Sequence, residues 1–247
     1  MDFTCESADQ YVSVNQSKVN KQYYPEYHLA PALGWMNDPN GVSFFKGEYH
    51  LFYQHYPYAA THGKMHWGHA KSPDGLCWSH LPVALAPDQT YDQGGCFSGS
   101  AIEKAGKLYL MYTGHLPDKK DKENTRQNQN IAISADGIHF KKFAGNPVLT
   151  EKDIPAGSSV TDFRDPKIFE RAGQYYCVIG SKTLDDQGQV LLYQSDDLLE
   201  WTFVSVVFPH NKYLGKMVEC PDLLIFAEKA VFILSAMDYV DEKGVYY

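Results

Sequence analysis

The chain has 247 residues, of which 44% are apolar, 14% aromatic and 21% charged, so disorder is excluded and one large β-type domain or two small ones are expected. The net charge of −8 arises from 22 basic and 30 acidic residues, and the scattered basic residues exclude the electrostatic pattern of a nucleic-acid-binding protein. No apolar run approaches the roughly 18 residues that a membrane-spanning helix needs, and five cysteines without a Cys-x-x-Cys pair argue against both a disulfide framework and a structural zinc site.

The first residues, Met1-Asp2-Phe3-Thr4-Cys5-Glu6, are polar and acidic. They show neither the basic start nor the apolar stretch of a secretory signal. The sequence therefore predicts a cytoplasmic protein. Residues 1–30 are expected to form a separate polar lead-in, which brings the chain to the next domain.

One short segment occurs three times, as Ser72–Trp78, Ser134–Phe140 and Ser195–Trp201. The steps between the copies are 62 and 61 residues. Each copy follows an extended apolar run and has Ser and Asp at turn positions before an aromatic residue, which predicts a hairpin. A period of this length indicates an architecture built from repeated units.

An apolar and aromatic run that follows a polar turn precedes each predicted hairpin, at Tyr49–Tyr53, Leu108–Tyr112 and Tyr175–Ile179. A fourth run of this kind is Val231–Leu234. Each unit then contains four short strands in a meander, the pattern of a β-propeller blade. From Asp38 onward the chain holds three full blades and the inner half of a fourth, about three and a half in all. Because a ring closes with roughly four to eight blades, residues 31–247 are predicted to be part of an all-β propeller.

Chemically active residues occur at one phase of this repeat, where the innermost strand of each unit begins. The four segments are Asn37-Asp38-Pro39, Phe97-Ser98-Gly99, Arg164-Asp165-Pro166 and Glu219-Cys220-Pro221. The three acids lie 127 and 54 residues apart, about two periods and one. We therefore expect them to converge at one end of the central channel, where mutual repulsion raises the pKa of at least one.

These motifs, with Trp35-Met36 before the first and His66-Trp67-Gly68-His69-Ala70 between them, resemble the ordered motif set of glycoside hydrolase family 32. The family includes invertases, fructanases and sucrose-6-phosphate hydrolases. The resemblance implies a five-bladed propeller followed by a β-sandwich, and we expect neither to be complete in these 247 residues. It also implies retaining hydrolysis of terminal β-fructofuranosides.

Carried over motif by motif, the resemblance implies that Asp38 is the nucleophile and Glu219 the general acid and base. It assigns Asp165, beside Arg164, to the ring hydroxyls and to the transition state. One ionised and one protonated carboxyl group suit a retaining mechanism. The residues that match sugar-binding positions are Trp35, Asn37, Gln54, Trp67, Phe97 and Ser98. His62 stands where the family usually has tryptophan, so the substrate preference is open and His62 is included as a candidate sugar contact.

The expected partner is a small sugar, either sucrose, sucrose 6-phosphate or a short fructan, with no cofactor and no metal. His62, His66 and His69 could suggest a metal site, but the glycines beside them favour a strand that directs His66 and His69 to opposite faces. Two other functions remain open: a sugar-binding propeller without catalysis, and a fructosyltransferase. The sequence does not indicate the oligomeric state.

Overall fold

A computed structural model of the chain describes residues 2–118, 120–209, 211, 213–227 and 229–246. These residues form three four-stranded antiparallel sheets and one two-stranded sheet. The first sheet has β1 (Trp35–Phe45), β2 (Glu48–Tyr56), β3 (His66–Ser72) and β4 (Ser79–Leu85). The second has β5 (Gly95–Lys104), β6 (Lys107–Leu116), β7 (Arg126–Ser134) and β8 (Lys141–Lys142).

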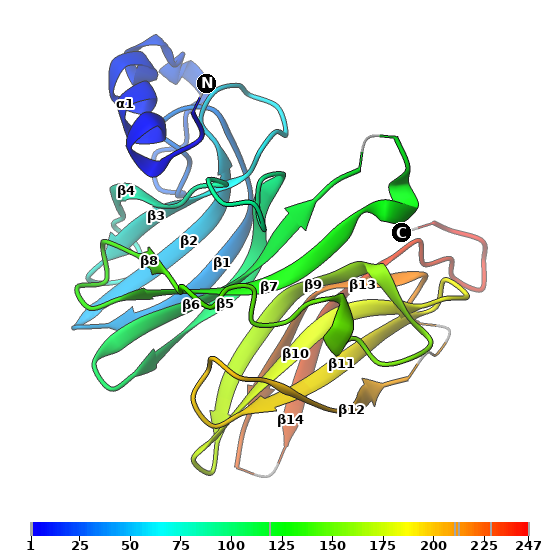
Figure 1. Cartoon of the computed structure of the whole chain (residues 1–247). Coiled ribbons are helices and arrows are strands. Elements are labelled where there is room, and N and C mark those ends of the chain that lie inside the picture. Colours follow the sequence, from blue (N-terminus) through cyan, green and yellow to red (C-terminus); the bar gives the residue numbers. More distant parts are fainter. Residues whose placement is uncertain (1, 119, 210, 212, 228, 247) are drawn as a thin grey trace.

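The third sheet has β9 (Ser158–Arg171), β10 (Gln174–Thr183), β11 (Gly188–Ser195) and β12 (Thr202–Phe208), and the last has β13 (Met217–Ile225) and β14 (Ala230–Met237). Within every sheet the strands follow chain order. The sheets are arranged around a common centre, where β1 contacts β5, β5 contacts β9 and β9 contacts β13 (Figure 1). The predicted propeller of three full blades and the inner half of a fourth is thus confirmed.

Type I′ turns join the first two strands of each complete blade. The three turns are Lys46-Gly47, Ala105-Gly106 and Ala172-Gly173, with φ of 50° and 87°, 50° and 73°, and 53° and 80°. This turn type needs positive φ at both central residues, and its twist matches that of the flanking strands. Glycine at the second position therefore adopts the positive φ of this turn without the backbone strain that a residue with a side chain would have there.

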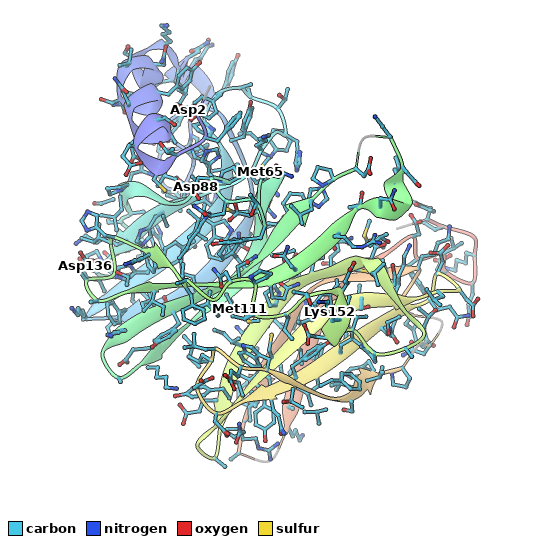
Figure 2. The ribbon with its side chains drawn as sticks, viewed as in Figure 1. Asp2, Met65, Asp88, Met111, Asp136 and Lys152 are labelled. Atoms are coloured by element: carbon cyan, nitrogen blue, oxygen red, sulfur yellow. The ribbon has the colours of Figure 1, made fainter. Side chains whose placement is uncertain are left out.

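The three copies of the repeated segment form the same hydrogen-bonded turn. In the second copy, the Ser134 hydroxyl accepts from Gly137 N at 2.8 Å, and Asp136 Oδ1 accepts from Ile138 N and His139 N. The same bonds recur from Ser72 and Asp74 and from Ser195 and Asp197. Figure 2 shows Asp136 at the outer edge of its sheet. The repeat thus encodes the turn that reverses the chain at each rim.

Apolar side chains fill the space between successive blades. One cluster joins the first two blades through Phe52, Trp67 and Tyr112. A second joins the next pair through Met111, Phe163 and Tyr193, and a smaller third lies between the third sheet and β13. Since a blade is a single sheet, it buries its faces only by stacking on neighbours, which fixes the inner strands around the channel.

The lead-in contains a helix that the sequence analysis did not predict. Helix α1 (Cys5–Asn15) begins at Thr4, whose hydroxyl accepts from Ser7 N in a capping box. Ala8 is buried, and Asp9 Oδ1 accepts from Val83 N of β4 at 2.9 Å. Figure 1 shows α1 lying against the first blade. Helix α1 therefore packs on the propeller. The boundary after residue 30, between a lead-in and the propeller, stays a prediction.

Four one-turn 3-10 helices complete the described secondary structure: Gln16–Lys18, Lys21–Tyr23, Lys122–Asn124 and Glu151–Asp153. None of the helices formed by the described residues is long and apolar enough to cross a membrane.

Candidate active site

Each inner strand is irregular at the predicted phase. The pairing register shifts between Met36 and Pro39 in β1, between Phe97 and Gly99 in β5, and between Glu219 and Asp222 in β13. In β9 the pairing register shifts between Arg164 and Lys167, so that Asp165 and Pro166 form the bulge. Such β-bulges re-aim side chains that a regular strand would direct into the sheet. The site motifs are therefore the bulges themselves.

Two bulge residues have left-handed backbone conformations, with φ of 62° at Asp165 and 47° at Cys220. A non-glycine residue in this region costs free energy unless its surroundings hold it there. The Thr113 hydroxyl accepts from Asp165 N at 3.0 Å, and Cys220 N donates to Asp165 Oδ2 at 2.9 Å. The strained peptides of two adjacent blades thus stabilise one another at the site.

Asp38, on β1, is half-buried and is held by the second blade as well as its own. Its Oδ2 accepts from the Ser98 hydroxyl at 2.7 Å and from Gln54 Nε2 at 3.1 Å. Gln54 Nε2 also donates to Ser98 Oγ. These hydrogen bonds limit the rotation of the carboxyl group. The structure thus brings these three predicted residues together.

Asp165, on β9, is almost fully buried, with 6% of its surface exposed. Burial raises its pKa to about 6, and the charges of Glu219 and Asp38 act in the same direction. The Arg164 charge and the hydrogen bond from Cys220 N oppose this rise. The electrostatic coupling indicates that the three acids lie close together, as their common phase predicts.

Glu219, on β13, is bound by the preceding blade through Arg164. Its Oε1 accepts from Arg164 Nε at 3.1 Å and from Nη2 at 2.9 Å. Arg164 Nη1 donates to Asp162 Oδ1 at 2.8 Å. Its position beside Asp165 suggests that Arg164 could keep Asp165 ionised, and its charge does act to lower the pKa of Asp165, although burial outweighs it. The guanidinium itself hydrogen-bonds to Glu219 and Asp162.

Aromatic rings form a row on the Asp38 side of the site. His62 is exposed and meets Trp35 and Phe97 edge-on, with ring centroids 6.5 and 6.2 Å apart. Phe97 stacks on His115 at 4.3 Å. Trp35 Nε1 donates to Asn37 Oδ1 at 2.7 Å. Predicted sugar contacts from β1, β5 and the β2–β3 loop thus lie side by side.

Trp67 departs from the expectation of a sugar contact. Its side chain is fully buried in the core between the first two blades. Its Nε1 donates to the Phe97 carbonyl at 3.0 Å. In this structure its indole is closed to a ligand, because residues of both blades cover it, and its effect on the site passes through Phe97.

The three histidines considered as possible metal ligands contact different partners. His62 belongs to the ring row, His66 Nδ1 contacts Lys64 O at 2.9 Å, and His69 Nε2 contacts His50 Nδ1 at 2.9 Å. Across the described part of the chain, no three His, Cys, Asp or Glu side chains are grouped as metal ligands.

Two cavities adjoin the acids. A cavity of about 130 Å³ in the channel is lined by all four inner strands and includes Asp165. A wider one of about 530 Å³ is lined by His115, Gln127, Asp162 and Lys182 among others. It lies beside Arg164, which Asp162 contacts directly.

Sequence reasoning missed His115, Asp162 and Lys182. His115 and Lys182 lie near the ends of second strands of their blades, as Gln54 does in the first blade. A polar residue near the end of the second strand of each blade was the sequence pattern that could have identified His115 and Lys182. Asp162 lacked even that signal, because its importance depends on a contact with Arg164 two residues away and on Lys182 from β10.

Comparison with known proteins places this geometry in a family. A 44%-identical relative, the sucrose-6-phosphate hydrolase of Zymomonas mobilis, aligns over 88% of this chain and 43% of its own length. The raffinose invertase of Escherichia coli is 48% identical over 81% of this chain and 41% of its own length. The chain therefore spans less than half the length of these relatives.

Solved structures agree with the sequence relatives. A GH32 beta-fructofuranosidase of Bombyx mori superposes with a TM-score of 0.86 at 44% identity, covering 94% of this chain and 48% of that protein. A mutant of that enzyme is known in complex with sucrose. The family model for the glycosyl hydrolases family 32 N-terminal domain matches residues 28–247. The chain belongs to glycosyl hydrolases family 32.

Proposed function

We propose that the protein hydrolyses terminal β-D-fructofuranosides with retention of configuration, and that sucrose or sucrose 6-phosphate is the substrate. The observation that carries this proposal is the convergence of Asp38, Asp165 and Glu219 from bulges of three inner strands, joined by contacts between blades. The relatives named as sucrose-6-phosphate hydrolase and invertase support the substrate class.

In the first step, a carboxylate oxygen of Asp38 attacks the anomeric carbon of the fructosyl group. The hydrogen bonds from Ser98 and Gln54 orient this carboxylate. Glu219 donates its proton to the glycosidic oxygen as the bond to the leaving group breaks. Since Glu219 Oε1 accepts two N–H groups of Arg164, the proton is carried by Oε2.

In the second step, Glu219 takes a proton from water, which attacks the anomeric carbon and releases Asp38. Asp165 accepts hydrogen bonds from ring hydroxyls, and its negative charge stabilises the oxocarbenium-like transition state. The ring row of Trp35, His62 and Phe97 covers an apolar face of the sugar. In this mechanism the aromatic residues and Asp165 bind the fructosyl group, Asp38 attacks it, and Glu219 transfers the proton.

The test is a hydrolysis panel of sucrose, sucrose 6-phosphate and short inulin, with products resolved at low and high sucrose concentration. We expect release of fructose with retained configuration in the first product formed. Transfer of fructose to a second sugar would identify a fructosyltransferase. Sugar binding without turnover would identify a binding propeller and overturn the hydrolase proposal.

A further inference from the structure

We infer that Asp162 is a positioning residue for the general acid, because it anchors the guanidinium that holds Glu219. This inference rests on the proposed function, in which Glu219 protonates the leaving group. Asp162 lies three residues before Asp165 on β9, and among the residues that the structure describes its side chain bonds to Thr161, Arg164 and Lys182 rather than to Asp38 or Glu219. It acts through Arg164.

The contacts form a continuous chain of alternating charge. Lys182 Nζ lies 3.2 Å from Asp162 Oδ2, Asp162 Oδ1 accepts from Arg164 Nη1 at 2.8 Å, and Arg164 Nη2 donates to Glu219 Oε1 at 2.9 Å. The Thr161 hydroxyl adds a bond to Asp162 Oδ2 at 2.8 Å. The Asp162 side chain is 22% exposed and that of Arg164 is 11% exposed. Charged groups this buried are restricted to a few arrangements and interact strongly.

Geometry makes the anchor specific. Arg164 uses Nε and Nη2 for Glu219 and Nη1 for Asp162, so its two carboxylate partners bind different edges of one rigid planar group. Asp162 thereby holds the guanidinium at the orientation in which its other edge meets Glu219. Without Asp162, the buried cation would be offset by fewer negative charges and its other edge would lose a fixed partner.

Several charged or titratable groups face this chain. Asp165 lies beside Arg164 on β9, Lys182 comes from β10, the Cys220 thiol from β13, Asp38 from β1 and His115 from β6. Burial and the Arg164 charge lower the pKa of His115 to about 4, so its imidazole is neutral above pH 5 and adds no charge. The charges that act on Glu219 are therefore those of Arg164, Asp162, Asp165, Asp38 and Lys182.

The test is the pH profile of kcat/KM for Asp162→Asn. Loss of one negative charge leaves more of the Arg164 charge acting on Glu219, which then gives up its proton more readily. We expect the basic limb of the profile to move to lower pH by about one unit and kcat for sucrose to fall roughly tenfold or more. Asp162→Glu should restore part of kcat, and an aryl fructofuranoside, whose leaving group needs little protonation, should be much less affected.

Lys182→Met gives an independent arm with the opposite sign, because it removes a positive charge from the same chain and should move the basic limb to higher pH. The matched control is Asp186→Asn, which removes the other partner of Lys182 at 2.7 Å while leaving Asp162 and Arg164 in place, and it should keep the wild-type profile. Thermal unfolding monitors the fold of each variant.

Wild-type profiles in both Asp162→Asn and Lys182→Met, or equal losses for sucrose and the aryl substrate, would overturn the inference while leaving the proposed function intact. Absence of fructoside hydrolysis in the wild-type protein would instead overturn the proposed function.

Discussion

Three carboxyl groups of similar chemistry lie close together at this site, and their contacts separate their roles. Asp38 accepts from a hydroxyl and an amide, Glu219 accepts from a guanidinium, and Asp165 accepts from a backbone N–H while almost fully buried. The two hydrogen bonds orient the Asp38 carboxyl group, which is the nucleophile in the proposed mechanism. Glu219 is partly exposed and is held through Oε1, so in the proposed mechanism Oε2 is the oxygen that transfers the proton.

The first prediction concerns Asp38 and Glu219. Asp38→Asn should reduce turnover by about 1,000-fold or more and abolish covalent labelling, because no other group is assigned to attack the anomeric carbon. Glu219→Gln should lower kcat for sucrose by roughly 100- to 10,000-fold. Only the second variant should recover activity with a good leaving group and with added azide. Identical leaving-group dependence in both variants would remove the basis for separate roles.

The second prediction is a pH-dependent gain of stability in Asp165→Asn. The pKa of Asp165 is about 6 in the folded protein against an ordinary 3.8. Between these values the folded state binds more protons than the unfolded state, so the wild-type free energy of unfolding falls as pH rises from about 4 to 6. The asparagine variant lacks this loss. Its advantage should therefore appear across this interval and reach at most about 3 kcal/mol above it, at roughly 1.4 kcal/mol per unit.

Denaturant unfolding from pH 4 to 8 measures this difference. Asp74→Asn is the control, because hydrogen bonds from the Cys77 and Leu76 N–H groups and the Ser72 hydroxyl lower the pKa of Asp74. The stabilisation from Asp74 is lost only below pH 4, so the difference between that variant and the wild type should stay constant across the interval. If the difference in the free energy of unfolding between Asp165→Asn and the wild type also stayed constant from pH 4 to 8, the charge of Asp165 would not destabilise the fold.

At the scale of elements, the repeated strands and turns could be predicted because their signals are local. Glycine at the second turn position and Ser and Asp at the rim turns act within a few residues. The phase of the acids followed from the same period. Helix α1 was missed because a short helix with little apolar periodicity depends on its contact with β4 for its stability.

The contacts between blades could not be predicted from local signals. Arg164 was expected beside its sequence neighbour Asp165, yet its side chain crosses to Glu219, 55 residues further on. Trp67 was expected to face the sugar, yet it packs between two blades. Both outcomes depend on how one sheet stacks on the next, and a single sequence gives no record of that stacking.

The third prediction tests one such contact, between the β4–β5 connection and β8. Lys142 Nζ lies 2.5 Å from Asp92 and 2.7 Å from Asp88, and Asp92 is fully buried. Figure 2 shows Asp88 beneath helix α1. Lys142→Met leaves Asp92 buried without its cation, so we expect a loss of about 3–5 kcal/mol in the free energy of unfolding.

Adding Asp92→Asn to Lys142→Met should recover part of this loss, because the amide no longer needs a counter-charge. Denaturant titrations of the two single variants and the double variant give the coupling between them. The outcome that would contradict a buried ion pair is simple additivity. Lys141→Met, one residue away on the same strand, is the control and should change stability little.

At the scale of the whole molecule, the site is assembled from blades that cannot form it alone. Asp38 is fixed by the second blade, Asp165 by the second and fourth sheets, and Glu219 by the third. Small changes in how sheets stack would therefore alter the site before they altered any one sheet. The contacts that hold the blades together are therefore also the contacts that position the three acids of the candidate site.

The last sheet shows what stacking leaves uncovered. Along β14, Phe232 and Leu234 pack on the cluster of the third sheet, whereas Val231 and Ile233 on the other face are 45% and 53% exposed. Leu224 and Ile225 of β13 are also exposed. In the part of the chain that the structure describes, β14 pairs with β13 alone, and a sheet with exposed apolar side chains and an unpaired edge favours association with other chains. We therefore expect this 247-residue chain to self-associate as its concentration rises.

The final prediction uses the alternation along β14. Ile233→Lys places a charge on the uncovered face and should reduce self-association, measured by sedimentation velocity over a range of concentrations, without lowering the melting temperature. Leu234→Lys, the adjacent residue on the packed face, should instead destabilise the fold, because it buries a charge against the third cluster. If Ile233→Lys lowered stability as much as Leu234→Lys while association stayed unchanged, the outer face of β14 would not be the surface through which the chains associate.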